Sequence, residues 1–265
     1  MALTISELKE VALNISERLK VDYTNYADGF LRRRIAYLFE KMAFHRTQDL
    51  NNALASLVKY EDIAFYLSLP QTELFRTPGF WRHLMKVLAD KEIKTIWLPD
   101  LGSYHELYSL LIILDIVGRR EDMRVVANVV SERIKNNIIS RHVNKKDDQQ
   151  DMSNFQRLET KAAYDQYVLQ QPDGSYLLRE GLLDNVEVRN GWFMNAENQQ
   201  FDLIILRDTL ISYNLKLHHN AVAHLADSLS RPGALLCLGV VERPLGSEDR
   251  FAPDENAVGI YSLIA

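Results

Sequence analysis

The chain of 265 residues is poor in cysteine, with Cys237 as its single thiol. One cysteine excludes a disulfide within the chain, and its place in the apolar run ALLCLGVV favours a buried small side chain over a nucleophile. No apolar run approaches the roughly 18 residues that a membrane-spanning helix needs. The opening stretch MALTISELKEVALNISERLK lacks the basic head and apolar centre of a signal peptide. We therefore expect a cytoplasmic protein without membrane insertion.

An excess of positive charge is also missing, because 31 lysines and arginines face 36 acidic residues and leave a net charge of −5. Nucleic acids and anionic membranes are bound by basic surfaces, so this balance predicts no nucleic-acid partner and favours a protein or a small molecule. The local exception is the run Arg32, Arg33 and Arg34. This run is interpreted either as a solvated helix face or as a contact surface for an acidic protein.

Histidines at a spacing typical of a metal site are missing too. His218 and His219 are adjacent and His224 follows five or six residues later, so no pair has the spacing of three or four that shares a helix face. We expect no metal site.

Apolar periodicity divides the chain into two parts. Spacings of three and four from Leu8 to Leu19, and similar patterns in FLRRRIAYLFEKM and DLNNALASLVKY, predict a helical domain over residues 1–75. From Ile93 onward, short β-branched or leucine-rich runs alternate with helical stretches. This alternation predicts an α/β domain over residues 76–265 with a mostly parallel sheet. The last runs, ALLCLGVVE and AVGIYSLIA, have no long helix between them and are expected to form an antiparallel edge.

Two segments have an irregular pattern. Residues 69–84 contain two prolines and are expected to hold the linker between the two domains. The stretch KKDDQQDMSN, residues 145–154, is strongly polar and predicts an exposed loop.

Strand, turn and helix follow one another in IWLPDLGSYHELYSLL, residues 96–111. α/β folds bind cofactors at such turns, usually through glycines that let the backbone approach the ligand. This turn instead contains Tyr104 and His105. The order of this stretch with FLRRRIAYLFEKM, TELFRTPGFWRHL, FDLIILRDTLISYN and LSRPGALLCLGVVE resembles the CheR-type chemotaxis receptor methyltransferases over nearly the whole chain.

The resemblance implies a helical N-terminal domain followed by a Rossmann-like S-adenosylmethionine methyltransferase domain. It also implies the methylation of glutamate side chains, with a chemoreceptor or another signalling protein as partner. Motif residues retained here imply catalytic roles for Arg76 and Arg207. They imply cofactor binding by Thr72, Arg76, Glu106 and Asp208, the last of which replaces a family asparagine. A substrate carboxylate is already a nucleophile at pH 7, so such an enzyme supplies mainly orientation and charge placement. Without the resemblance, both arginines are interpreted as partners of nearby carboxylates.

Besides Asp208, four positions that face the cofactor in the family carry other residues here. Tyr104 replaces a motif glycine, Val129 stands where the family has the acidic residue that binds the ribose hydroxyls, Trp192 lies at the adenine position, and Ser212 replaces a tyrosine. A register shift offers three substitutes for the missing carboxylate, namely Asn128, Ser131 and Glu132. The sequence thus leaves two hypotheses. The favoured one is a degenerate family member that acts as a protein-binding or regulatory module, with Tyr104 or Trp192 filling the adenosyl volume. The alternative is an active protein-glutamate O-methyltransferase.

Overall fold

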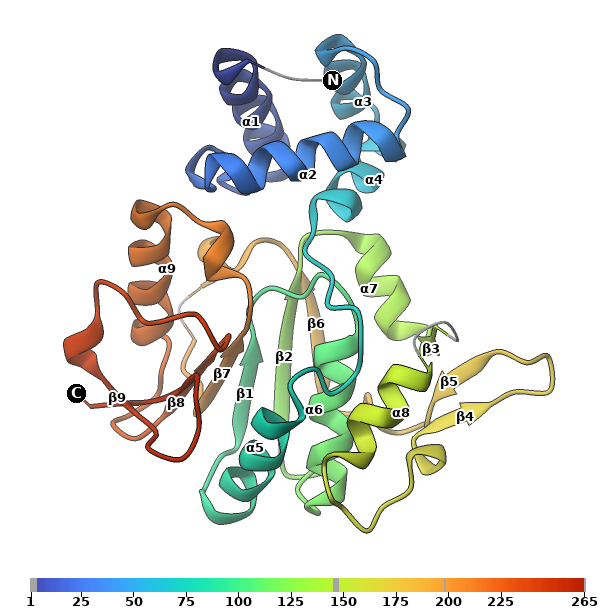
Figure 1. The fold of residues 1–265 in the computed structure, drawn as a ribbon, viewed down its shortest axis with the longest axis vertical. Coiled ribbons are helices and arrows are strands. Elements are labelled where there is room, and N and C mark those ends of the chain that lie inside the picture. The colour runs from blue at the N-terminus through green and yellow to red at the C-terminus, as the bar shows by residue number, and fades with distance from the viewer. Residues whose placement is uncertain (1–3, 145–147, 198, 265) are drawn as a thin grey trace.

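The computed structural model describes residues 4–144, 148–197 and 199–264, and Figure 1 shows a small helical unit stacked on a larger α/β unit. The helical unit comprises α1 (Ile5–Leu19), α2 (Asp28–Lys41), α3 (Thr47–Ala55) and α4 (Leu57–Leu67). The helix expected over DLNNALASLVKY is in fact two helices. Ser56 has an extended backbone, with φ −87° and ψ 126°, and its hydroxyl accepts a hydrogen bond from the Lys59 amide. Serine is a favoured N-cap, so α4 begins there in a new direction.

The α/β unit is built on a seven-stranded sheet with the strand order β6-β2-β1-β7-β8-β10-β9. The strands are β1 (Thr95–Leu98), β2 (Arg124–Val129), β6 (Val186–Asn190), β7 (Leu203–Leu206), β8 (Leu235–Leu238), β9 (Phe251–Pro253) and β10 (Ile260–Leu263). Neighbours from β6 to β8 pair in parallel, whereas β10 pairs antiparallel with β8 and with β9. The predicted Rossmann-like α/β fold and its antiparallel edge are confirmed.

Helices cover both faces of this sheet. On one face, α5 (Pro78–Asp90), α6 (His105–Ile116) and α7 (Glu132–Ile139) share an apolar core with Ile96, Leu98 and Val125. On the other face, α9 (Leu215–Asp227) packs with Trp97 and Val126, and this second core continues into the helical unit. Residues 68–77 connect α4 to α5, and the exact domain boundary after residue 75 stays a prediction. Among the described residues, no helix has the length and apolar character needed to cross a membrane.

The exposed loop expected at 145–154 is wrong for most of its length, because α8 spans Asp148–Gln156. Residues 145–147 lie outside the described residues. Asp151 and Asn154 are buried and bind the backbone of Leu74: the Asp151 carboxylate accepts from the Leu74 amide at 2.7 Å, and the Asn154 side chain donates to its carbonyl at 2.9 Å. Both polar side chains therefore have a hydrogen-bond partner inside the protein, as most buried polar groups do.

A second, smaller sheet projects from the α/β unit beside α8 (Figure 1). It contains β3 (His142–Val143), β4 (Val168–Gln170) and β5 (Tyr176–Leu178), paired antiparallel in the order β3-β5-β4. The sequence alone does not reveal this sheet, because its strands are only two or three residues long.

The helical unit is fastened to the α/β unit on two sides. On one side, the Ala27 amide donates to the Ser212 carbonyl and the Asn214 amide donates to the Asn25 carbonyl, both at 2.9 Å. On the other side, the Glu61 carboxylate of α4 accepts from the Glu132 amide at 2.9 Å, at the start of α7. The helical unit therefore lies over the carboxyl ends of the central strands, where α/β folds bind ligands.

Candidate active site

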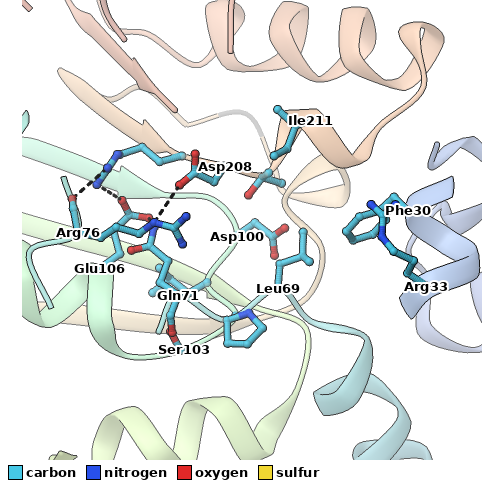
Figure 2. Close-up of a pocket in the computed structure, with 15 residues that line it drawn as sticks. Phe30, Arg33, Leu69, Gln71, Arg76, Asp100, Ser103, Glu106, Asp208 and Ile211 are labelled. Atoms are coloured by element: carbon cyan, nitrogen blue, oxygen red, sulfur yellow. Dashed lines mark hydrogen bonds and ion pairs between the residues drawn. The ribbon is translucent and has the colours of Figure 1, made fainter. Parts of the chain in front are cut away.

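A cavity of about 290 Å³ opens where β1 and β7 end, between the α/β unit, the linker and α2 (Figure 2). Its position follows from the fold, because the carboxyl ends of neighbouring parallel strands meet at one edge of the sheet. The lining residues come from four segments: Phe30 and Arg33; Leu69, Pro70, Gln71 and Arg76; Asp100, Leu101, Gly102, Ser103 and Glu106; Arg207, Asp208, Thr209 and Ile211.

The inner wall of the cavity holds a buried ion pair between Arg207 and Glu106, whose Nη1 and Oε1 atoms lie 3.2 Å apart. Arg207 also donates to the Arg76 carbonyl at 3.1 Å and lies 4.2 Å from the ring centre of Phe80. Gln71 donates to the second oxygen of Glu106 at 2.9 Å. Burial raises the pKa of Glu106 to about 7, although Arg207 opposes this shift. The pair therefore joins β7, α6 and the linker in one network.

Arg76 and Asp208 form a second, looser pair at the cavity wall. The Arg76 Nε atom lies 3.8 Å from Asp208 and 3.9 Å from Glu73, and the Arg76 side chain is 43% exposed. Asp208 has φ 60°, a left-handed conformation that is unfavourable for most residues with a side chain. Glu242 stabilises this turn, because its carboxylate accepts from the amides of Asp208, Ile211 and Gly239 at 2.6 to 3.1 Å. The Arg76 side chain is thus held only by two long ion pairs, whereas the backbone of Asp208 is held by Glu242.

The linker crosses directly over the turn after β1. A Cβ atom placed on Gly102 would lie 2.0 Å from the Leu69 carbonyl oxygen, so only glycine permits this approach. The Ser103 hydroxyl donates to the Gln71 carbonyl at 3.0 Å, and Arg34 of α2 donates to the carbonyls of Leu67 and Ser68. Close backbone contact with Gly102 is therefore made by the protein's own linker.

Asp100 brings a further carboxylate to the cavity, two residues beyond the end of β1. It lies between the Arg76–Asp208 pair and the Phe30 and Arg33 side chains of α2 (Figure 2). Burial raises the pKa of Asp100 to about 7. The sequence analysis missed this residue, although its place in the turn of a candidate cofactor motif was a usable signal.

Comparison with known proteins connects this geometry to a family. Residues 70–259 match the family described as CheR methyltransferase, SAM binding domain. The chain belongs to the CheR methyltransferase family. The resemblance inferred from its motifs is thereby confirmed, and the family match covers the α/β unit around the cavity except for β10.

Solved structures with a similar fold include two methyltransferases. One is a candidate sarcosine dimethylglycine methyltransferase from Galdieria sulphuraria, with 14% identity and a TM-score of 0.30 over 62% of this chain and 46% of that one. The other is the magnesium protoporphyrin IX methyltransferase from Synechocystis PCC 6803 with bound SAM, with 11% identity and a TM-score of 0.39 over 87% of this chain and 96% of that one. The chain spans less than half the length of the first structure.

The structure brings together most of the site residues expected from the CheR resemblance. Arg76, Glu106, Arg207 and Asp208 all line the cavity. Thr72 does not: it is exposed, and its hydroxyl donates to the Glu73 carboxylate. The charged residues near the expected methyl-transfer position are therefore assembled in this family member.

Tyr104, which replaces a CheR motif glycine, is not among the lining residues. Its ring stacks on His105 at 4.1 Å and on Tyr108 at 4.8 Å between ring centres. Its hydroxyl accepts from the Asn144 amide at 2.8 Å, close to the small sheet. The hypothesis that Tyr104 occupies the ligand volume is therefore not supported, and the helical spacing of four to Tyr108 explains its direction.

Val129, aligned with the CheR ribose-binding carboxylate, is fully buried in the core beneath α6 and α7. The three possible substitutes already have other partners. Asn128 accepts from the Trp97 indole at 2.8 Å, Ser131 caps α7, and Glu132 accepts from the Asn190 side chain at 3.0 Å. None of them lines the cavity. The described structure thus places no carboxylate from the end of β2 in the cavity.

Aromatic side chains occupy the space beside this strand end. Trp192, at the expected adenine position, is buried in the core that joins the sheet to the helical unit. Tyr213 belongs to the same core and meets Tyr26 of the helical unit at 4.9 Å between ring centres. Ser212 is fully buried, and its hydroxyl donates to the Thr209 carbonyl. Charged side chains therefore line the cavity, whereas buried aromatic side chains lie at the position where the resemblance places adenine.

Proposed function

We propose that this CheR-family protein is degenerate in cofactor binding and acts as a protein-binding or regulatory module for a chemoreceptor or another signalling protein in the cytoplasm. The observation that carries this proposal is the burial of Trp192 and Tyr213 in the core of the helical unit, since the resemblance places adenine at Trp192. A ligand there would have to displace a packed apolar cluster, and such displacement costs several kcal/mol.

The size of the cavity supports the same proposal. The cavity measures about 290 Å³, which lies at the lower end of the range of ligand pockets. Ligand pockets usually measure roughly 300–1,000 Å³. The loss of the ribose carboxylate removes a charge-assisted hydrogen bond worth about 1.5–3 kcal/mol.

The active protein-glutamate O-methyltransferase is the second candidate function. It is favoured by the meeting of Arg76, Glu106 and Arg207 in one cavity, where Arg76 is held only by long ion pairs and is available to orient a substrate carboxylate. Arg207 is 4% exposed and donates to the Arg76 carbonyl, so its part in this scheme is to position Arg76. We give this candidate second place because it needs the adenosine end to open.

A protein partner fits the surface around the cavity mouth. Four aliphatic residues with exposures of 45% to 73% surround the turn held by Glu242: Ile211, Leu215, Val240 and Val241. The Ile211 and Gly239 amides both bind the Glu242 carboxylate, so the 211 and 240 segments are neighbours. Exposed apolar groups gathered at one place are typical of protein-binding surfaces. The small sheet β3-β5-β4 offers a second contact for an extended receptor tail.

The proposal is tested by measuring binding and methyl transfer with the same partner. The purified cytoplasmic fragment of a chemoreceptor is titrated with the protein, and methyl transfer from radiolabelled S-adenosylmethionine is then followed under the same conditions. We expect saturable binding without transferred label. A Val241→Asp variant should bind the fragment about tenfold more weakly, whereas Ile5→Asp, on an exposed residue of α1, should not. Label incorporated into receptor glutamates would establish the second candidate instead.

A further inference from the structure

β6 lies at one edge of the seven-stranded sheet and, among the described strands, pairs only with β2. The Val125 amide donates to the Asn185 carbonyl at 3.1 Å, and the Gly191 amide donates to the Val129 carbonyl at 2.7 Å. The backbone groups of a strand point alternately to its two sides, so the odd-numbered residues of β6 use theirs to bind β2. The even-numbered residues therefore direct their amides and carbonyls away from the sheet.

These outward groups are largely unpaired. Val186 is engaged, since its amide donates to the Leu183 carbonyl at 3.2 Å. Within the part of the chain that the structure describes, no hydrogen bond involves the backbone amide or carbonyl of Val188 or Asn190. A free strand edge of this kind is a template for pairing with a further strand.

The opposite edge of the sheet, at β9, offers no such template. The Asp254 amide donates to the Ile260 carbonyl at 2.9 Å, so Phe251 and Pro253 direct their backbone groups outward. The Phe251 amide donates to the Glu248 carbonyl, and a proline has no amide hydrogen. Free outward amides are therefore confined to the β6 edge of this sheet, within the described residues.

The side chains of β6 place both signs of charge along its edge. Glu187 and Arg189 lie on the same face, with their side chains 48% and 26% exposed, and the Arg189 Nε atom lies 2.7 Å from the Glu187 carboxylate. Val186 and Val188 lie on the other face, where they pack against the core beneath α6 and α7. The edge is thus apolar on one face and carries one charge of each sign on the other.

This order of charges is complementary to itself. If two copies of β6 pair antiparallel with Val188 opposite Val188, Glu187 of each copy lies opposite Arg189 of the other, and opposite charges on facing strands attract. A shift of the pairing by two residues instead sets Glu187 opposite Glu187 or Arg189 opposite Arg189. A shift by one residue sets outward backbone groups opposite inward ones. The sequence of the edge therefore selects one register.

We propose that the β6 edge binds the β6 edge of a second copy of this chain, antiparallel about a two-fold axis at Val188. The outward amides and carbonyls of Val188 and Asn190 then gain partners, and the two sheets become continuous. Such an interface is closed by its symmetry, so it yields a dimer and not a fibre. The inference goes beyond the proposed function and requires neither a receptor nor S-adenosylmethionine.

Sedimentation equilibrium of the full chain tests this dimer. Interfaces that bury less than about 1,200 Å² are usually weak, so the measurement covers protein concentrations from about 1 µM to about 1 mM. Glu187→Arg sets like charges opposite each other at two symmetric places and should weaken dimerisation about tenfold. Asp227→Arg, which changes the net charge equally and breaks an exposed pair with Arg250, should stay within about twofold of the original chain.

A charge swap makes the test specific for the register. Arg189→Glu alone should weaken the dimer as Glu187→Arg does, whereas the chain with both changes should recover it, since opposite charges again face each other. An equal mixture of the two single variants should form a mixed dimer more tightly than either variant alone. Thermal unfolding verifies that each variant is folded.

Amide hydrogen exchange shows whether the backbone of the edge takes part. The Val188 and Asn190 amides should exchange more slowly as the protein concentration rises. A monomer at every concentration, a loss that the double change does not recover, or a dimer with both amides unprotected would overturn the proposal. Protection of these amides only when a receptor fragment is added would also overturn it and would assign the edge to another protein.

Discussion

The two ends of the site differ in what this chain has kept. At the methyl-transfer end, Arg76, Glu106 and Arg207 line a cavity and are joined by hydrogen bonds and an ion pair. At the adenosine end, Val129 is buried in one core and Trp192 in the other. The charged residues thus lie where they also stabilise the fold, whereas buried apolar residues stand at the two positions that the resemblance assigns to adenosine binding.

This difference indicates that the retained charges are not by themselves evidence of catalysis. The Arg207–Glu106 pair joins three segments, so it stabilises the fold whether or not a ligand enters the cavity. Trp192, at the expected adenine position, in contrast belongs to a core shared by the helical unit and the α/β unit. The most informative variants are therefore those that distinguish a structural role of the residues around the cavity from a role in ligand binding.

The largest effect is expected from Arg207→Met. The change leaves Glu106 buried without its ionic partner, so the free energy of unfolding should fall by about 3–5 kcal/mol. Urea denaturation at pH 8 measures it. Arg76→Met, which breaks only exposed pairs 3.8 and 3.9 Å long, should change stability by less than about 1 kcal/mol. Equal effects of the two changes would contradict a structural role of the buried pair, and Glu106→Gln added to Arg207→Met should recover part of the loss.

The next effect is expected from Gly102→Ala at the crossing of the linker. The new methyl group would overlap the Leu69 carbonyl, so unfolding should become easier by about 2–3 kcal/mol. Residues 68–77 should also become more sensitive to limited proteolysis, because the linker must move away. Gly79→Ala near the start of α5 is the control, since a Cβ there meets nothing within 4 Å and alanine favours the helix. If both variants behave alike, the linker is not held against the turn.

Asp100→Asn should stabilise the protein in a pH-dependent manner. The folded pKa near 7 lies above the value of 3.8 for an ordinary aspartate, so folding disfavours the ionised form. This penalty is absent at low pH, grows as the pH rises from about 4 to about 7, and is complete above that range. The variant should gain about 1–2 kcal/mol over the original chain at pH 8 and less at pH 5, as measured by urea denaturation. A gain in stability that is independent of pH would show that folding does not disfavour the ionised form of Asp100.

The smallest effect is expected from Glu61→Gln at the contact between α4 and α7. The carboxylate accepts from the Glu132 amide at the start of α7, where the helix dipole favours negative charge. Its neutralisation should cost about 0.5–1 kcal/mol in thermal unfolding at low salt, and less at high salt because the charge is screened. Glu10→Gln, on an exposed residue of α1, serves as the control. If Glu10→Gln lowers the thermal stability as much as Glu61→Gln, the contact between α4 and α7 does not stabilise the protein more than an ordinary surface carboxylate does.

Much of the fold could be predicted because its strands are continuous apolar runs and its helices keep their period. The antiparallel edge of β8 and β10 followed from the lack of a helix between two such runs. The helix over 148–156 could not be found in this way. Its polar residues Asp151 and Asn154 are buried through hydrogen bonds to Leu74, a partner more than seventy residues away in the chain.

The site was predictable where motif positions are retained, as for Arg76, Glu106, Arg207 and Asp208. The direction of the Tyr104 side chain was not predicted, because it depends on stacking with His105 and Tyr108. The place of Asp100 in the site could not be predicted, because it depends on how the linker and α2 pack around the turn after β1.

The central claim is that the adenosine end is closed, and titration of the full chain with S-adenosylhomocysteine tests it most directly. This ligand carries the complete adenosine and lacks the transferable methyl group, so the heat reports binding alone. The account predicts no saturable heat below millimolar ligand. Saturable 1:1 binding in the micromolar range would contradict it and would restore the methyltransferase as the function of this chain.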